Sequence, residues 1–274
     1  MQENWSQELI RIHKNIDLNI IRTGTGDKPS LILAHGLSDD AFCWEPLASD
    51  LEDNYDIIMY DAYGHGRSSR VDPEIRFDLV EDLHDLIEIL KLEKPNMIGH
   101  SMGAYTLARF AAKYPDIPSA IVLEDPPWTV NPLSAEQAKE MRASFRQNNQ
   151  MNQEKSLKAL VKFKKNDSPN WDARIYDLWA QAKHAFDLSF LDQYPFKQED
   201  WRNTIKSINV PTLIIAGDPE KGAYVTPKMG ITAVTLLKQG EFGHISGCGH
   251  CVRYEQYQPY LSMVKLFLKR NLPS

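Results

Sequence analysis

The stretch "NMIGHSMGAYTLARF" (residues 96–110) decides the fold. A short apolar run, 96–100, leads through Gly-His-Ser-Met-Gly into an amphipathic segment, 102–115. We predict a buried strand followed directly by a helix, with Ser101 on the turn between them. Glycines on both sides of Ser101 allow a turn too tight for larger side chains, and such a turn exposes the serine hydroxyl. The pentapeptide alone is a weak signal, but a nucleophilic serine requires this strand–turn–helix context.

Apolar runs and longer amphipathic runs alternate along much of the remaining chain. The apolar runs predict strands at 16–24, 30–36, 55–62, 119–125 and 210–218. Helical periodicity predicts helices over 77–92 and 254–270, the second distorted at Pro259. This alternation predicts an α/β fold, in which helices cover both faces of a mainly parallel, doubly wound sheet.

The interval between Asp125 and Val210 breaks this alternation. It is helical in pattern and rich in tryptophan. We therefore predict that residues 128–207 form a helical cap inserted into a core made of residues 1–127 and 208–274. Aromatic side chains over the carboxyl edge of a sheet suit a bulky, largely apolar ligand. The candidate pocket residues are Trp44, Trp128, Trp171 and Trp179, although core packing would explain these side chains almost as well.

Two backbone N–H groups are candidates for stabilising negative charge beside Ser101. Met102 begins the predicted helix, so its N–H points toward a developing oxyanion. His-Gly ends the 30–36 strand, where Gly36 permits an unusual turn and makes the Leu37 N–H a natural second donor. The nearby segment "DAYGHGRSS" (61–69) predicts a structural loop, with His65 as a loop hydrogen-bonding residue rather than a catalyst.

Together these motifs resemble the α/β-hydrolase superfamily, and within it the serine esterases and lactonases that carry a helical cap. The resemblance covers nearly the whole chain outside the cap: the His-Gly turn, D-x-x-G-x-G-x-S at 61–68, the Ser101 turn, a strand ending in acid and a late Gly-His. It implies Ser101 as nucleophile, His250 as general base, and the Leu37 and Met102 amides as oxyanion hole. A serine nucleophile argues against haloalkane dehalogenases and epoxide hydrolases, which carry aspartate at this position.

The chemistry of the residues agrees with these roles. A serine hydroxyl is a poor nucleophile until an imidazole within hydrogen-bond reach takes its proton. That imidazole in turn needs a carboxylate to hold its tautomer.

The sequence leaves the position of that carboxylate open. In most relatives the acid follows the strand at 210–218, where this chain reads "GDPEKGAYVTP" (217–227). Glu220 stands where aspartate is usual, and Asp218 comes two residues too early. A minority of relatives take the acid from the end of the preceding strand, where Asp125 precedes Pro126 and is expected to be extended. We rank Asp125 first, Glu220 second and Asp218 third, with an ordinary turn aspartate as the competing interpretation of Asp125.

The stretch "SGCGHC" (246–251) contains a Cys-x-x-Cys pair. A thioredoxin-type pair belongs at the start of a helix after an early strand, whereas this pair lies late in the chain. A zinc site on His244, Cys248, His250 and Cys251 would lack a usual signature and would consume the candidate base. We therefore predict small apolar packing roles for both cysteines and no metal or organic cofactor, with a reversible Cys248–Cys251 disulfide as the less favoured alternative.

Composition excludes several classes of function. The net charge of −6 and the pI of about 5.8 argue against nucleic-acid binding, which needs a basic face. No apolar run approaches the roughly 20 residues of a membrane span, and the first residues lack the apolar region of a signal peptide. Three cysteines fit a reducing compartment. We expect a cytoplasmic enzyme with a small-molecule partner, and the sequence predicts no oligomeric state.

The predicted function is hydrolysis of a bulky apolar ester or lactone through an acyl-enzyme. The aromatic cap and the Asp-Pro-Pro-Trp loop (125–128) resemble serine-dependent macrolide esterases, which implies an antibiotic lactone ring as substrate and a role in resistance. Other lactonases, acting on acyl-homoserine lactones or mycotoxins, and general carboxylesterases fit the same features. A cofactor-free perhydrolase or acyltransferase, or a ligand receptor on a hydrolase scaffold, remains an alternative of a different class.

Overall fold

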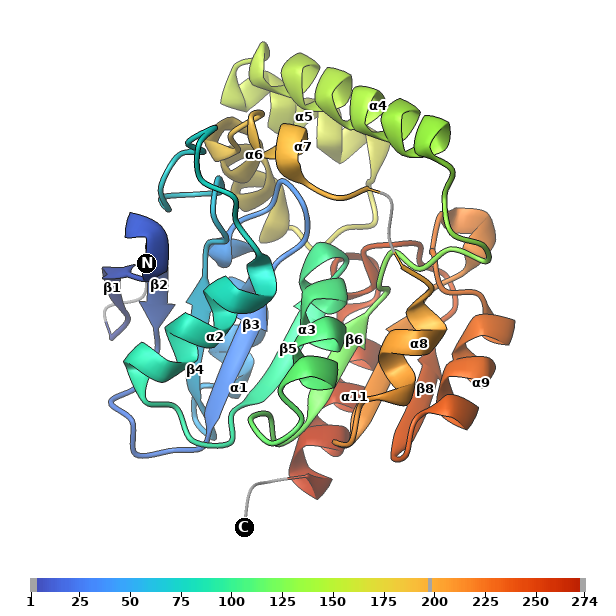
Figure 1. Ribbon diagram of the computed structural model, residues 1–274. Helices are drawn as coiled ribbons and strands as arrows, with labels where there is room; N and C mark the ends of the chain where they lie inside the picture. Colours follow the sequence, from blue (N-terminus) through green and yellow to red (C-terminus); the bar gives the residue numbers. More distant parts are fainter. Residues whose placement is uncertain (1–3, 197–198, 272–274) are drawn as a thin grey trace.

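The computed structural model describes residues 4–196 and 199–271, and within them eight strands form one sheet (Figure 1). The strand order is β1-β2-β4-β3-β5-β6-β7-β8. Strands β1 and β2 pair antiparallel, and β2 pairs antiparallel with β4, whereas every pair from β4 to β8 is parallel. The strands span Ser6–Arg11 (β1), Asp17–Arg22 (β2), Ser30–Ala34 (β3), Asp56–Tyr60 (β4), Asn96–His100 (β5), Ile121–Glu124 (β6), Thr212–Ala216 (β7) and Gly240–His244 (β8).

Helices cover both faces of this sheet, which confirms the predicted α/β fold. One face carries α1 (Glu45–Leu51) and α11 (Tyr257–Arg270), and the other carries α2 (Leu79–Leu90), α3 (Met102–Lys113), α8 (Trp201–Lys206) and α9 (Pro227–Leu236). Because successive strand side chains point to opposite faces, β3 serves both cores. Its Leu31 and Leu33 pack toward α1 and α11, while Ile32 packs toward α2 and α3.

Helices α4 (Ala135–Gln153), α5 (Leu157–Asp167), α6 (Ile175–Ala185) and α7 (Phe190–Gln193) lie between β6 and β7 in the chain. Figure 1 shows them gathered over one end of the sheet. Side chains from α4 and α6 line the same cavity as Ser101, so this is the end at which β5 terminates. In contrast, α8 packs against α3 and α9 beside the sheet. The extent of the cap, 128–207, stays a prediction. By its contacts, α8 belongs with the helices that cover the sheet.

The remaining helices are short. They are η1 (His13–Asn15), η2 (Ala41–Trp44), η3 (Pro219–Lys221) and α10 (Val252–Glu255). The distortion predicted at Pro259 falls at Gln256, between α10 and α11. Pro259 stands in the first turn of α11, where backbone N–H groups have no helical partner and a proline is therefore tolerated.

Two edge strands were not predicted. β1 is mostly exposed, and β8 contains two glycines and only one large apolar residue, Phe242. Neither segment has the continuous apolar run that marks a buried parallel strand. None of the helices in the described ranges is long and apolar enough to cross a bilayer.

Candidate active site

Ser101 occupies a strained turn between β5 and α3. Its backbone φ of 51° lies in the left-handed region, which non-glycine residues adopt rarely. A Cβ added to Gly99 would lie 2.6 Å from the Gly103 carbonyl carbon, and one added to Gly103 would lie 2.1 Å from the Ala34 oxygen. Only glycine fits at either position. The glycines of the motif therefore let β3, β5 and α3 approach closely enough to hold Ser101 at the carboxyl end of β5.

His250 and Asp125 are in direct contact. The Nδ1 atom of His250 lies 2.6 Å from Oδ2 of Asp125, which is fully buried at the end of β6. The backbone N–H groups of Tyr224 and Val225 donate to the two carboxylate oxygens, each at 2.9 Å. Three donors thus fix the carboxylate, and the carboxylate fixes the imidazole through its Nδ1–H.

The backbone of Asp125 differs from the prediction. Its φ is 39°, so the extended conformation expected from Pro126 is wrong. Tertiary contacts outweigh the local preference here. The Asp125 N–H donates to the Ile215 carbonyl at 2.8 Å, and residues 224–225, which follow β7 in the chain, hold the side chain. Strain of this kind persists where the surroundings over-determine a residue, commonly at functional sites.

The two alternative acids have other surroundings. Asp218 accepts a hydrogen bond from the Gly247 N–H at 2.7 Å and pairs with Nε2 of His244 at 2.9 Å. It therefore braces the loop that carries His250. Glu220 is exposed on η3.

The loop around His250 is held by groups that the sequence did not single out. His100, next to Ser101, is buried, and its Nε2 donates to the His250 carbonyl at 3.1 Å. Burial lowers the pKa of His100 well below its usual range, so this imidazole is neutral. The Gly249 N–H faces the Glu255 carboxylate at 3.2 Å. A Cβ on Gly249 would lie 2.2 Å from the Lys221 carbonyl oxygen, which explains the glycine.

The cysteines of this loop behave as packing groups. Cys248 is buried and its thiol donates to the Ile245 carbonyl at 3.1 Å. Burial raises the pKa of the Cys248 thiol to about 12 and also raises that of Cys251. Cys43, Cys248 and Cys251 are all free thiols. Across the described residues, no group of three or more His, Cys, Asp or Glu side chains could hold a metal ion.

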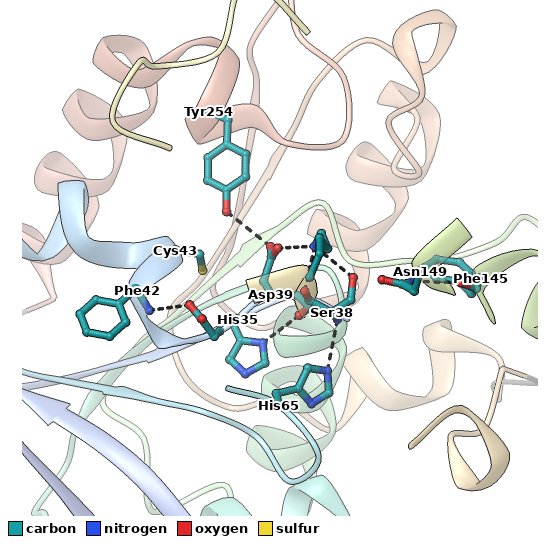
Figure 2. A network of polar contacts seen from close by, with 12 residues as sticks. His35, Ser38, Asp39, Phe42, Cys43, His65, Phe145, Asn149 and Tyr254 are labelled. Atoms are coloured by element: carbon teal, nitrogen blue, oxygen red, sulfur yellow. Dashed lines mark hydrogen bonds and ion pairs between the residues drawn. The ribbon is translucent and has the colours of Figure 1, made fainter. Parts of the chain in front are cut away.

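The candidate oxyanion donors stand beside Ser101. Leu37 and Met102 line the same cavity as Ser101 and His250, and Met102 is the first residue of α3. After Leu37, the Ser38 N–H donates to Nε2 of the buried His65 at 3.2 Å (Figure 2). The Nδ1–H of His65 donates to the Tyr63 carbonyl at 2.9 Å. His65 is thus a loop hydrogen-bonding residue, as predicted.

The cavity in front of Ser101 has a volume of about 170 Å³. Its lining is mainly apolar and aromatic, and α4 and α6 contribute to it. The apolar and aromatic side chains are Leu37, Met102, Pro127, Leu133, Met141, Phe145, Trp179, Tyr194, Phe196, Tyr224 and Tyr254. Met141 and Phe145 stand four residues apart on α4, a helical spacing that could have marked them in the sequence.

Of the four predicted pocket tryptophans, only Trp179 lines the cavity. Contrary to the prediction, Trp44, Trp128 and Trp171 are not among the lining residues: the first two pack against residues outside the cavity, and Trp171 packs against Tyr254, which itself lines it. Trp44 is fully buried under the Arg253 guanidinium, 3.9 Å from the ring centre. Trp128 stacks on Trp201 with ring centres 4.6 Å apart, and Trp171 packs against Tyr254 at 4.8 Å.

Comparison with known proteins identifies the family. The profile of the alpha/beta hydrolase fold family matches residues 29–257, so this chain belongs to that family. It is 22% identical to epoxide hydrolase 1 of Caenorhabditis elegans over 98% of this chain and 71% of the relative. It is 26% identical to a 2-hydroxy-6-oxononadienedioate/2-hydroxy-6-oxononatrienedioate hydrolase of Paraburkholderia phymatum over 94% and 91%. It is 25% identical to 3-oxoadipate enol-lactonase 1 of Acinetobacter baylyi over 92% and 93%.

Two solved structures share the fold. E-2-(acetamidomethylene)succinate hydrolase superposes with a TM-score of 0.75 at 22% identity, covering 97% of this chain and 99% of the other. Naproxen esterase from Bacillus subtilis superposes with a TM-score of 0.72 at 19% identity, covering 96% and 91%. These relatives are hydrolases of several kinds, and the resemblance to macrolide esterases stays a prediction.

Proposed function

We propose that this protein hydrolyses carboxylic esters or lactones through an acyl-enzyme on Ser101. One observation carries the proposal: Ser101 on its strained turn and His250, bonded through Nδ1 to the buried Asp125, line one cavity. A nucleophile, a base and a carboxylate that orients the base are the parts that covalent acyl transfer needs. A serine nucleophile argues against the epoxide opening named for the nematode relative.

The mechanism follows from the hydrogen-bond directions. Because the Nδ1–H of His250 donates to Asp125, the lone pair of Nε2 is left to accept the Ser101 proton. The serine oxygen then attacks the carbonyl carbon, and the Leu37 and Met102 N–H groups stabilise the oxyanion. The imidazolium returns the proton to the leaving alcohol. Water, activated by the same imidazole, repeats the attack and releases the acid.

The cavity favours an uncharged substrate. Its one lysine, Lys183, has its ammonium bonded to Asp39 at 2.7 Å, so no unpaired permanent cation faces the cavity from the described lining residues. A substrate carboxylate buried there without a partner would cost several kcal/mol. We therefore place neutral esters and lactones ahead of the dicarboxylate compounds named for several relatives.

The cavity volume also bears on substrate size. About 170 Å³ lies below the roughly 300–1,000 Å³ typical of pockets for drug-sized ligands. An intact macrolide ring would need the helices over the cavity to move outward. We therefore rank short and medium neutral esters and small lactones first. A macrolide lactone comes second, on the resemblance of the aromatic cap and the 125–128 loop.

A substrate panel tests this proposal. It contains p-nitrophenyl esters of two to eight acyl carbons, γ- and δ-lactones, an acyl-homoserine lactone and a 14-membered macrolide. We expect turnover of neutral esters, with release of acid and alcohol in equal amounts. Hydrogen peroxide or an added alcohol that captures most of the acyl group would indicate a perhydrolase or acyltransferase instead. No turnover of any member would indicate a receptor.

A further inference from the structure

We propose that Lys183 of α6 is a positioning residue for the oxyanion hole, because its ammonium fixes the turn that carries the Leu37 N–H. We call residues 36–40 the oxyanion loop. The inference rests on the proposed function, since it concerns how that same site stabilises its transition state. By this inference, helix α6, which lies between β6 and β7 in the chain, helps to position a donor of the oxyanion hole at the edge of the sheet.

The Lys183 ammonium is buried against the oxyanion loop. Its Nζ donates to the Ser38 carbonyl at 2.8 Å, to the Ser38 hydroxyl at 3.0 Å and to Oδ1 of Asp39 at 2.7 Å. An ammonium has three N–H donors, so all of them are spent on two consecutive residues. Lys183 and Asp39 are each only 6% exposed. A lysine this buried is rare unless paired, and here the hydrogen bonds of its ammonium all go to the oxyanion loop.

The oxyanion loop needs such support because its backbone is strained. Ser38 has a φ of 63°, in the left-handed region, a conformation that costs about 1–3 kcal/mol in a non-glycine residue. Its two backbone polar groups are each held by a side chain from a distant part of the sequence. The N–H donates to His65 (Figure 2), and the carbonyl accepts from Lys183. The Asp39 N–H closes the turn by donating to the Gly36 carbonyl at 3.1 Å. Leu37 lies inside this closed turn.

The paired carboxylate is held in its charged form by the same contact. Burial alone would raise the pKa of Asp39, but the charge and hydrogen bond of Lys183, with smaller contributions from Arg253 and His35, together outweigh burial and lower the pKa. The Tyr254 hydroxyl approaches the other oxygen, Oδ2, at 3.4 Å (Figure 2). Loss of Lys183 would release the Ser38 carbonyl and strand the Asp39 charge, so the oxyanion loop would relax and the Leu37 N–H would turn away from the oxyanion.

This loss has a kinetic signature. An oxyanion donor acts on the transition state and not on the bound substrate, so its misplacement lowers kcat and leaves KM nearly unchanged. Removal of one donor outright costs about 10²–10³ in kcat, and misalignment of one should cost about 10–100-fold. A substrate-binding lysine would instead raise KM at constant kcat.

The test compares Lys183→Met with Lys164→Met on a neutral p-nitrophenyl ester, with kcat divided by the active sites titrated with a fluorophosphonate. Lys164, on the adjacent helix α5, is a matched control. Its Nζ pairs with Asp167 at 2.8 Å and lies 4.3 Å from the ring centre of Trp171. We expect the ~10–100-fold fall in kcat for Lys183→Met alone, with KM within about threefold. An aryl trifluoromethyl ketone, whose hemiketal oxyanion occupies the hole, should lose affinity by the same factor.

Three results would overturn the inference. The first is an unchanged kcat in Lys183→Met, and the second is a rise in KM alone in that variant. The third is full recovery of kcat in the Lys183→Met/Asp39→Asn double variant, which would show that Lys183 only balances the charge of Asp39. If Lys183→Met does not fold, Lys183→Gln takes its place, because glutamine keeps a donor for the Ser38 carbonyl. The kcat of Lys183→Gln should fall less than tenfold, and a larger fall in kcat would count against the inference. A wild-type protein that neither turns over esters nor labels would overturn the proposed function itself.

Discussion

The Asp125 carboxylate lies 2.6 Å from Nδ1 of His250, although 125 positions separate the two residues in the chain. The contact joins the end of β6 to the loop that follows β8, and β7 lies between those two strands. At the end of β7, Asp218 braces the histidine loop through Gly247. The carboxylate that orients the imidazole therefore comes from the strand next to the Ser101 strand.

Asp125→Asn should lower kcat by about 10⁴, because the amide carries no charge and its NH₂ group, when it faces Nδ1, favours the wrong tautomer of His250. The amide also has only one oxygen, so one of the Tyr224 and Val225 N–H groups loses its acceptor. The measurement is steady-state hydrolysis of a neutral ester by folded protein. Glu220→Gln is the control and should keep most of the activity, since Glu220 is exposed. The reverse pattern, with Glu220→Gln inactive and Asp125→Asn active, would refute our assignment of the acid.

Gly103→Ala should destabilise the fold strongly. The added methyl group would meet the backbone oxygen of Ala34 at 2.1 Å, which no side-chain rotation relieves. We expect a loss of at least ~3 kcal/mol in the free energy of unfolding by urea, at or above the usual cost of overpacking.

Gly26→Ala gives the comparison for backbone strain alone. Its methyl group would meet only the flexible end of Arg22 at 3.5 Å, and its φ is 99°. The expected loss is about 1–2 kcal/mol. Equal losses at both positions would show that the approach of β3 to α3 does not constrain Gly103.

The thiols should be unreactive in the folded protein. At pH 8, a Cys248 thiol with a pKa of about 12 is almost wholly protonated, and Cys43 is buried with its pKa raised by burial. Iodoacetamide at pH 8 should therefore leave Cys43 and Cys248 unmodified until urea is added, as read by peptide mass spectrometry. The Cys248→Ser/Cys251→Ser double variant should keep most esterase activity. Rapid alkylation of Cys248, or loss of activity in the double variant, would assign the loop a thiol function.

Ester charge should affect the rate. We expect kcat/KM for p-nitrophenyl butyrate to exceed that for the p-nitrophenyl monoester of succinic acid by at least ~10-fold, because the Lys183 charge is already paired with Asp39. A preference for the succinate ester would show that a cation recognises carboxylates in this cavity. It would bring the specificity close to the dicarboxylate compounds named for several relatives.

Much of the fold follows from local sequence patterns. The strands from β2 to β7 fall within two residues of their predicted bounds, because buried strands are written as compact apolar runs. Ser101 and its glycines are equally local, since a tight strand–helix turn needs small residues on both sides of the serine.

The features of the site that could not be predicted from the sequence depend on contacts between residues far apart in the chain. The left-handed backbone of Asp125 arises from bonds to β7 and to residues 224–225, which no local preference encodes. Trp44 and Trp128 were predicted to line the cavity, but Arg253 and Trp201 already cover their rings. Lys183 was missed because a lysine on an amphipathic helix ordinarily faces solvent.

The most direct test of the central claim is the site and stoichiometry of labelling by a fluorophosphonate, read by intact mass and peptide mapping. We predict one adduct per chain, located on Ser101, with ester hydrolysis abolished in proportion to labelling. Ser101→Ala should carry no adduct and lose about 10⁶ in kcat. An adduct on another residue, or a Ser101→Ala variant that still turns over esters at a comparable rate, would contradict the account.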